Sequence, residues 1–151
     1  MKGNIKHVWS VLCSGVSIDQ NTNNLTLFNI IEQIKISENK LVKVEDENKL
    51  AIPLAFSLVT LWRREDHKFT EKVDVGIEVV DPNGLKRKSN LYSFKFTAGM
   101  KRMRYQIRWG GIKVTTSGTY KFIVSLKEAK SKRFVSVGEA YLEVEILPSG
   151  K

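Results

Sequence analysis

Apolar and polar side chains alternate with a period of two through most of this chain, and this pattern restricts the fold more than any other feature. Segment 73–79 places apolar residues at the odd positions, and 103–109 does the same with a polar residue at every even position. Segment 120–126 has apolar residues at its even positions. Such a strand buries one face and exposes the other. No segment shows a helical period, so we expect an all-β protein.

Turn-forming residues divide the alternating runs into about eight expected strands. The strongest turn is 81–84 (Asp-Pro-Asn-Gly), where proline presets φ and glycine accepts a positive φ, so the flanking runs should form a hairpin. Gly138 shifts the alternation of the last run, which predicts a β-bulge. We expect strands at 5–18, 24–36, 52–63, 69–80, 85–97, 101–109, 118–127 and 133–147.

Strands at this spacing are typical of an antiparallel β-sandwich with an immunoglobulin-like or related topology. Tyr120 opens a strand just after Gly118, as the corner tyrosine does in immunoglobulin-like domains, and this favours a sandwich over a barrel. Because 151 residues is the size of one domain, we expect a single domain over 1–151. Segment 37–50 is rich in charge and poor in apolar residues, so it should be an exposed excursion.

Cysteine usage and hydropathy suggest the compartment. Cys13 is the only cysteine, so no intramolecular disulfide can form. We therefore expect a cytoplasmic protein in which Cys13 is a core residue. The apolar stretch 8–13 follows two lysines, but it is too short for a secretion signal and contains Ser10. No apolar run is long enough to span a membrane, so no membrane partner is expected.

The sequence contains no recognisable catalytic or metal-binding motif. The two histidines, His7 and His67, have no metal-ligand spacing, and no glycine-rich phosphate loop occurs. The acidic clusters 45–47 and 65–66 are interpreted as solvated loop charge. We expect a protein that is not an enzyme and has no cofactor or metal. The enzymatic alternative requires a pocket that gathers Asp66 and His67 with Ser or Tyr side chains.

The net charge of +9 comes from the second half of the chain. Residues 1–75 hold ten basic and ten acidic side chains, whereas 85–133 contain 14 Lys and Arg against one acid, Glu128. In the expected strands 85–97, 101–109 and 118–127, alternation places the basic side chains on one face and the apolar side chains on the other. If these strands are neighbours, the basic residues form one face. The candidate binding residues are Lys86, Arg87, Lys88, Lys95, Arg102, Arg104, Arg108 and Lys121.

A face of one charge indicates an anionic partner. Our leading hypothesis is a non-enzymatic binding or adaptor domain that uses this basic face against an acidic partner. A nucleic-acid binder is the alternative, although Tyr92, Tyr105 and Trp109 fall on the core side and leave no outward ring for stacking. The competing interpretation is an ordinary solvated face in which Glu143 and Glu145 pair with the basic strands. Exposed strand edges also leave a homo-oligomer open.

Several runs resemble one family. Segments 11–19 (VLCSGVSID) and 25–32 (LTLFNIIE), separated by a polar turn, resemble the opening of a family of small uncharacterised prokaryotic proteins. Segments 79–84 (VVDPNG) and 118–122 (GTYKF) continue the resemblance, which spans most of the chain. It implies a stand-alone cytosolic β-sandwich of unknown function. Its motifs are turns and core strands, so it assigns no functional residue.

Overall fold

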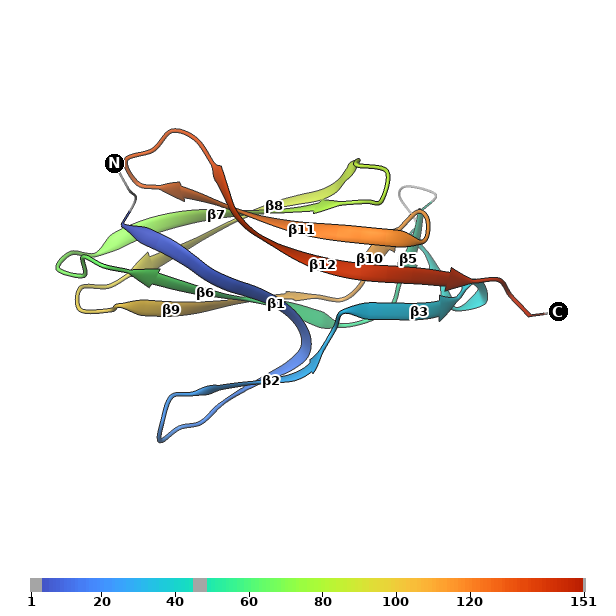
Figure 1. Ribbon diagram of the computed structural model, residues 1–151, viewed down its shortest axis with the longest axis horizontal. Coiled ribbons are helices and arrows are strands. Elements are labelled where there is room, and N and C mark those ends of the chain that lie inside the picture. Colours follow the sequence, from blue (N-terminus) through green and yellow to red (C-terminus); the bar gives the residue numbers. More distant parts are fainter. Residues whose placement is uncertain (1–3, 45–48, 151) are drawn as a thin grey trace.

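The computed structural model describes residues 4–44 and 49–150, and their regular structure is β-strand apart from one 3-10 turn. Two main sheets pack face to face, and a small third sheet lies near one end of them (Figure 1). This arrangement confirms the expected all-β sandwich. No helix in the described ranges is long and apolar enough to cross a lipid bilayer.

Three sheets make up the fold, and their strands are named in spatial order. Sheet A contains β2 (Leu25–Ile30), β1 (Ile5–Ile18), β6 (Phe56–Arg64) and β9 (Arg102–Trp109). Sheet B contains β3 (Gln33–Ser37), β12 (Val135–Leu147), β11 (Gly118–Glu128), β7 (Glu71–Val80) and β8 (Lys86–Phe96). Sheet C contains β10 (Ile112–Val114), β5 (Lys49–Ile52) and β4 (Val42–Val44), and the 3-10 turn η1 spans Glu38–Lys40.

The facing sides of sheets A and B form one hydrophobic core. Trp62, Tyr120 and Phe122 are fully buried, as the alternation of their strands predicts for the last two. Burial of one such side chain stabilises the fold by about 1.5–3 kcal/mol. The ring of Phe94 in β8 lies 5.3 Å from that of Tyr105 in β9, centroid to centroid. Strands β8 and β9 therefore face each other across the sandwich.

Two predicted turn features are present. The hydroxyl of Tyr120 donates a hydrogen bond to the carbonyl of Thr116 at 2.8 Å, so the ring anchors the turn before its own strand. In the turn 81–84, the carboxylate of Asp81 accepts a hydrogen bond from the N–H of Leu85 at 2.9 Å. Gly84 has a φ of 82°, a value that glycine adopts without strain. Both turns confirm the sequence-based expectation.

The predicted strand 24–36 is wrong as a single element. Its first part is β2 in sheet A, and its second part is β3 in sheet B. Asn29 has a φ of 48°, a left-handed conformation that asparagine tolerates better than most residues, and it turns the chain near the end of β2. Strand β3 then pairs in parallel with β12. The expectation of a wholly antiparallel sandwich is therefore wrong at this edge of sheet B.

The expected excursion 37–50 is partly structured. Strand β5 pairs with β4 on one side and with β10, a strand that the sequence pattern does not predict, on the other. Leu41 and Leu50 pack against the core, whereas Glu38 and Lys40 are exposed. The acidic cluster 45–47 lies outside the described residues. Sheet C therefore adds a wall at one end of the sandwich.

Strand β12 contains the bulge predicted at Gly138. Val124 of β11 pairs with Gly138, but the next residue, Ser125, pairs with Ser136. The His7 ring of β1 occupies the space that a Cβ atom at Gly138 would need. Glycine is therefore required here for the close approach of β1 to β12.

The β1–β2 hairpin, which forms one edge of sheet A, extends below the rest of the sandwich, at the lower left of Figure 1. At its tip, Asn23 accepts a hydrogen bond from the guanidinium of Arg104 in β9 at 2.7 Å. Because β6 separates β1 from β9 in the sheet, this contact carries the tip across the outward face of sheet A. Cys13 lies in β1 and is fully buried, as predicted. This burial raises the pKa of its thiol.

Candidate functional site

The outward side of sheet A carries four arginines, Arg63 of β6 and Arg102, Arg104 and Arg108 of β9, which we call the arginine face. Alternation sets their direction, because the residues between them, such as Trp62 and Ile107, are buried in the core. Neither β6 nor β9 contains a carboxylate. Among the described residues, no acidic side chain forms an ion pair with any arginine of this face.

The arginine face includes like charges in direct cross-strand register. Lys6 of β1 lies opposite Arg63, and Arg63 lies opposite Arg102, so three cations share one row across three strands. Lys6 forms an ion pair with Glu65, whereas Arg63 and Arg102 are exposed. Like charges directly opposite each other destabilise a sheet, so this row is not explained by cross-strand charge pairing.

Arg104 is held differently from its neighbours on β9. It is half-buried, and its guanidinium donates both to the backbone carbonyl and to the side-chain oxygen of Asn23, at 3.0 and 2.7 Å. The contact fixes the hairpin tip over the outward face. Arg102 and Arg108 remain exposed on either side. Arg104 therefore organises the face, and the other two arginines of β9 present their charge to solvent.

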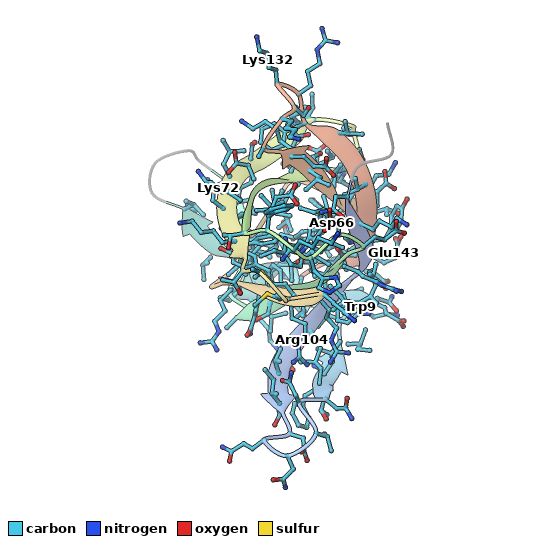
Figure 2. All side chains as sticks on the ribbon, turned by 90° about the vertical axis from the view of Figure 1, so that its left-hand side faces the viewer. Trp9, Asp66, Lys72, Arg104, Lys132 and Glu143 are labelled. Carbon is cyan, nitrogen blue, oxygen red and sulfur yellow. The ribbon has the colours of Figure 1, made fainter. Side chains whose placement is uncertain are left out.

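A groove of about 140 Å³ lies where the tip of the β1–β2 hairpin approaches the outward side of β6 and β9. Trp9 and Leu61 form its floor, Leu25 comes from the hairpin, and Arg102 and Arg104 supply the charge. Figure 2 shows Trp9 and Arg104 on the side of the molecule that faces the hairpin. The groove thus places an aromatic ring next to two guanidinium groups, an arrangement suited to an anionic ligand with an apolar or planar part.

The sequence pattern does not identify Trp9 as an outward residue. In a regular strand His7 and Trp9 share one face, but the register shifts between them, so His7 lies opposite Trp62 and Trp9 lies opposite Leu61. The bulge turns Trp9 outward. The only signal in the sequence is Val8 between two bulky rings, which does not by itself indicate a bulge.

The expectation that the basic residues form one face is wrong. Lys95 and Lys121 project outward from β8 and β11 of sheet B, whereas Arg102, Arg104 and Arg108 project outward from sheet A. Period-two alternation defines the two sides of a strand but not the sheet to which it belongs, so it wrongly suggests that β8 and β9 lie side by side. The predicted set is divided between opposite outer faces of the sandwich.

The outward face of sheet B is a mixture of both charges. Its ion pairs are Lys35–Glu145 (3.1 Å), Lys86–Glu78 (2.7 Å), Lys127–Asp74 (3.4 Å) and Lys72–Asp74 (3.8 Å). Lys95 lies opposite Lys72, whose ammonium approaches Asp74. Glu143 accepts a hydrogen bond from Thr119 at 2.5 Å. The solvated-face interpretation therefore describes sheet B, although Glu145 pairs with β3 and not with a basic strand.

The predicted triad 86–88 is also divided. Lys86 pairs with Glu78 on the outward face of sheet B. Lys88 continues the regular register of β8, so it lies opposite the buried Val79, and its ammonium is 5.5 Å from the Trp109 ring centroid. The register shifts only between Val79 and Val80, and this shift places Lys86 opposite Val80. The side chain of Arg87 lies outside the described residues. Lys88 therefore lies on the core side of β8, at the end of the sandwich, and not in an outward basic patch.

No catalytic arrangement gathers around Asp66 and His67 in the part of the chain that the structure describes. The Asp66 carboxylate accepts a hydrogen bond from the N–H of Lys68, and the His67 ring contacts the carbonyl of Glu65, so both serve their own loop. Neither residue lines the groove beside sheet A or the larger cavity near sheet C. Within the described ranges, no three His, Cys, Asp or Glu side chains are grouped so that they could hold a metal ion.

Comparisons with known proteins inform the fold only. No protein-family model and no curated protein sequence matches the chain. A crystal structure of the C-terminal domain of wzt is similar, with a TM-score of 0.50 and 11% identity over 95% of this chain and 74% of that chain. The CooA pilin subunit from enterotoxigenic Escherichia coli matches with a TM-score of 0.42 and 9% identity over 97% of this chain and 100% of that one. The first similarity agrees with an all-β domain, and the resemblance to a prokaryotic family stays a prediction.

Proposed function

We propose that this protein is a non-enzymatic binding domain whose arginine face docks an acidic segment of a partner protein. The observation that carries the proposal is the register of Arg63 opposite Arg102, without a carboxylate on either strand. Cross-strand pairs of like charge cost stability, and a bound anion would remove that cost. The face also lies on strands, which hold side chains more rigidly than loops do.

The spacing of the arginines suits an extended acidic segment. Alternate residues of a strand lie about 6.8 Å apart, and an extended peptide presents its alternate side chains at the same interval. Strand β9 pairs only with β6 among the described strands, so its other edge offers backbone groups to an added strand. Carboxylates on such a strand would lie next to Arg102 and Arg108.

Single-stranded nucleic acid is a second candidate, which the Trp9 groove favours. Trp9 lines the groove together with Arg102 and Arg104, and stacking of a base on an aromatic ring is the common element of such binding. This outward ring removes the objection that the basic side of the protein carries no aromatic residue. We favour the acidic protein because the groove contains one ring, whereas a strand of several nucleotides normally uses several.

The test is a fluorescence anisotropy titration with a labelled ten-residue glutamate peptide and, separately, a labelled ten-nucleotide oligothymidylate. We compare Arg102→Glu/Arg108→Glu with Lys95→Glu/Lys121→Glu, since both double variants change the net charge equally. The peptide should bind the wild type, and more weakly as salt rises from about 50 to 200 mM. The sheet A variant should lose at least about tenfold in affinity, and the sheet B variant less than about threefold.

Two results would contradict the proposal. Equal losses in the two double variants would show that net charge, and not the arginine face, controls binding. Tighter binding of the oligonucleotide than of the peptide, abolished by Trp9→Ala, would replace the acidic protein with single-stranded nucleic acid as the partner.

A further inference from the structure

A second cavity lies at the end of the sandwich that sheet C closes. It has a volume of about 300 Å³, and its walls come from β6, β7, β8, β9 and β11 of the main sheets and from β4, β5 and β10. The arginine face does not contribute to it. The cavity is therefore a separate feature, formed because the short strands of sheet C cap the core without filling its end.

Three aromatic rings form the inner wall of this cavity. Phe56 and Trp109 lie 5.2 Å apart between ring centroids, Trp109 and Phe122 lie 5.3 Å apart, and Phe56 and Phe122 lie 6.1 Å apart. All three rings are buried, so they are fixed by core packing before any ligand enters. The wall offers a rigid apolar surface, as small-molecule sites commonly do.

One buried hydrogen-bond donor at this end of the core has no acceptor among the described atoms. The indole N–H of Trp109 is buried and donates to no acceptor among the described atoms. A buried donor without a partner costs about 1–3 kcal/mol, and few occur in a native fold. The Trp109 N–H is thus a polar group at the inner wall of an otherwise apolar cavity end.

Positive charge lies at the edge of the cavity. Lys88 of β8 and Lys113 of β10 both line it. Regular alternation along β8 places Lys88 on the core side, opposite the buried Val79, and its ammonium lies 5.5 Å from the Trp109 ring centroid. No described carboxylate pairs with Lys88, in contrast to Lys86 two residues earlier, which pairs with Glu78. Within the described residues, the Lys88 charge beside the apolar wall thus has no neutralising anion.

We propose that this cavity binds a small apolar carboxylate, with its hydrocarbon part against the three rings and its carboxylate beside Lys88. At about 30 Å³ for each water-sized group, the volume accepts roughly ten heavy atoms. A polar anion such as phosphate leaves the aromatic wall uncovered. A neutral hydrocarbon makes no use of the Lys88 charge. A monocarboxylate of this size satisfies both parts of the cavity, and the inference does not depend on the arginine face.

Octanoate, which has ten heavy atoms, is the probe, and 1-octanol is its neutral counterpart. Isothermal titration calorimetry on the full chain should show one octanoate site in the wild type. Lys88→Gln should weaken octanoate binding about fivefold and leave octanol binding unchanged, because only the ion pair is lost. Lys86→Gln is the matched control, since it removes the same charge outside the cavity, and it should leave both affinities unchanged.

A cavity-filling variant tests the location independently. Ala51 lines the cavity from β5, and Ala51→Leu should weaken octanoate and octanol together. Circular dichroism checks that each variant is folded. Absence of saturable octanoate binding to the wild type would overturn the proposal. Equal effects of Lys88→Gln and Lys86→Gln, or unchanged binding to a folded Ala51→Leu variant, would overturn it as well.

Discussion

The two outer faces of the sandwich both carry several cations but arrange them in opposite ways. On sheet B, one lysine each of β3, β7, β8 and β11 lies next to a carboxylate of the same sheet, as in Lys35–Glu145 and Lys86–Glu78, although Lys95 lies opposite Lys72. On sheet A, Arg63 lies opposite Arg102, and β6 and β9 contain no carboxylate. Much of the charge of sheet B is thus paired within the sheet, whereas the arginines of sheet A form no ion pair among the described residues, and we propose that a partner supplies the opposite charge.

Under the proposed function, this difference separates charge that maintains a surface from charge that recognises a ligand. Exposed ion pairs of the kind seen on sheet B contribute about 0.2–1 kcal/mol each and keep a sheet face soluble. A row of like charges, such as Lys6, Arg63 and Arg102 on sheet A, gives no such stabilisation. The total charge of the chain would be the same in either arrangement, so the proposed binding depends on the register of the residues and not on their number.

The largest expected change in the free energy of unfolding comes from comparing Arg63 and Arg64, two adjacent residues of β6 that point in opposite directions. Arg64 is 2% exposed, and its guanidinium donates to the carbonyls of Phe69, Thr97 and Met100 at 2.6, 2.6 and 2.8 Å. Arg64→Met leaves these acceptors without their donor and should lower the free energy of unfolding by about 3 kcal/mol.

The matched control for Arg64→Met is Arg63→Met, which removes an exposed cation from the next position. It should change the free energy of unfolding by less than about 0.5 kcal/mol. Urea denaturation measures both. Comparable losses in the two variants would show that the arginine face is part of the stabilising structure, and the division between stabilising and binding arginines would not hold.

A charge reversal on each face should change stability in opposite directions. Arg63→Glu replaces a repulsive cross-strand neighbour of Arg102 with an attractive one, and should raise the free energy of unfolding by about 0.5 kcal/mol. Glu78→Lys removes the partner of Lys86 and should lower it by a similar amount. Urea denaturation at low salt measures both shifts, and salt should reduce them. Shifts of the same sign would contradict the proposed contrast.

The smallest expected effect concerns acid stability, which sheet B should influence through Asp74. The hydrogen bond from Ser93, and then the nearby Lys72 and Lys127, lower the pKa of Asp74 below its ordinary value of 3.8. Because the folded-state pKa is the lower one, the stabilisation is present above about pH 4 and is lost as pH falls through the folded-state value.

Asp74→Asn should therefore flatten the decline in unfolding free energy between about pH 4 and pH 2. Ser93→Ala, which removes the main donor to Asp74, should flatten it in part. Thermal denaturation as a function of pH measures the slope. An unchanged slope in both variants would show that the charges of sheet B do not support the fold.

The sequence predicted the inward side of individual strands better than their assembly. Alternation correctly placed Tyr105 and Trp109 toward the interior, and the turn 81–84 and the bulge at Gly138 were located correctly. These features are local, since they depend on neighbouring residues along one chain segment. They could therefore be inferred without knowledge of which strands are paired.

Sheet membership and the candidate site required the structure. Nothing in the pattern of 85–97 and 101–109 indicates that consecutive strands belong to different sheets. The site depends on three such non-local facts: the bulge that turns Trp9 outward, the crossing of the hairpin over Arg104, and the register of Arg63 with Arg102. A one-residue shift reverses the face of every later side chain in a strand, so small irregularities decide the site.

The most direct test of the binding face maps where an acidic ligand contacts the protein. Backbone amide chemical shifts of the ¹⁵N-labelled protein are followed during titration with the ten-residue glutamate peptide. We predict that the perturbed amides cluster on β6, β9 and the tip of the β1–β2 hairpin, around Arg63, Arg102 and Arg108. Perturbations that cluster on β7, β11 and β12, or that are spread evenly over both faces, would contradict the central claim that sheet A carries the binding face.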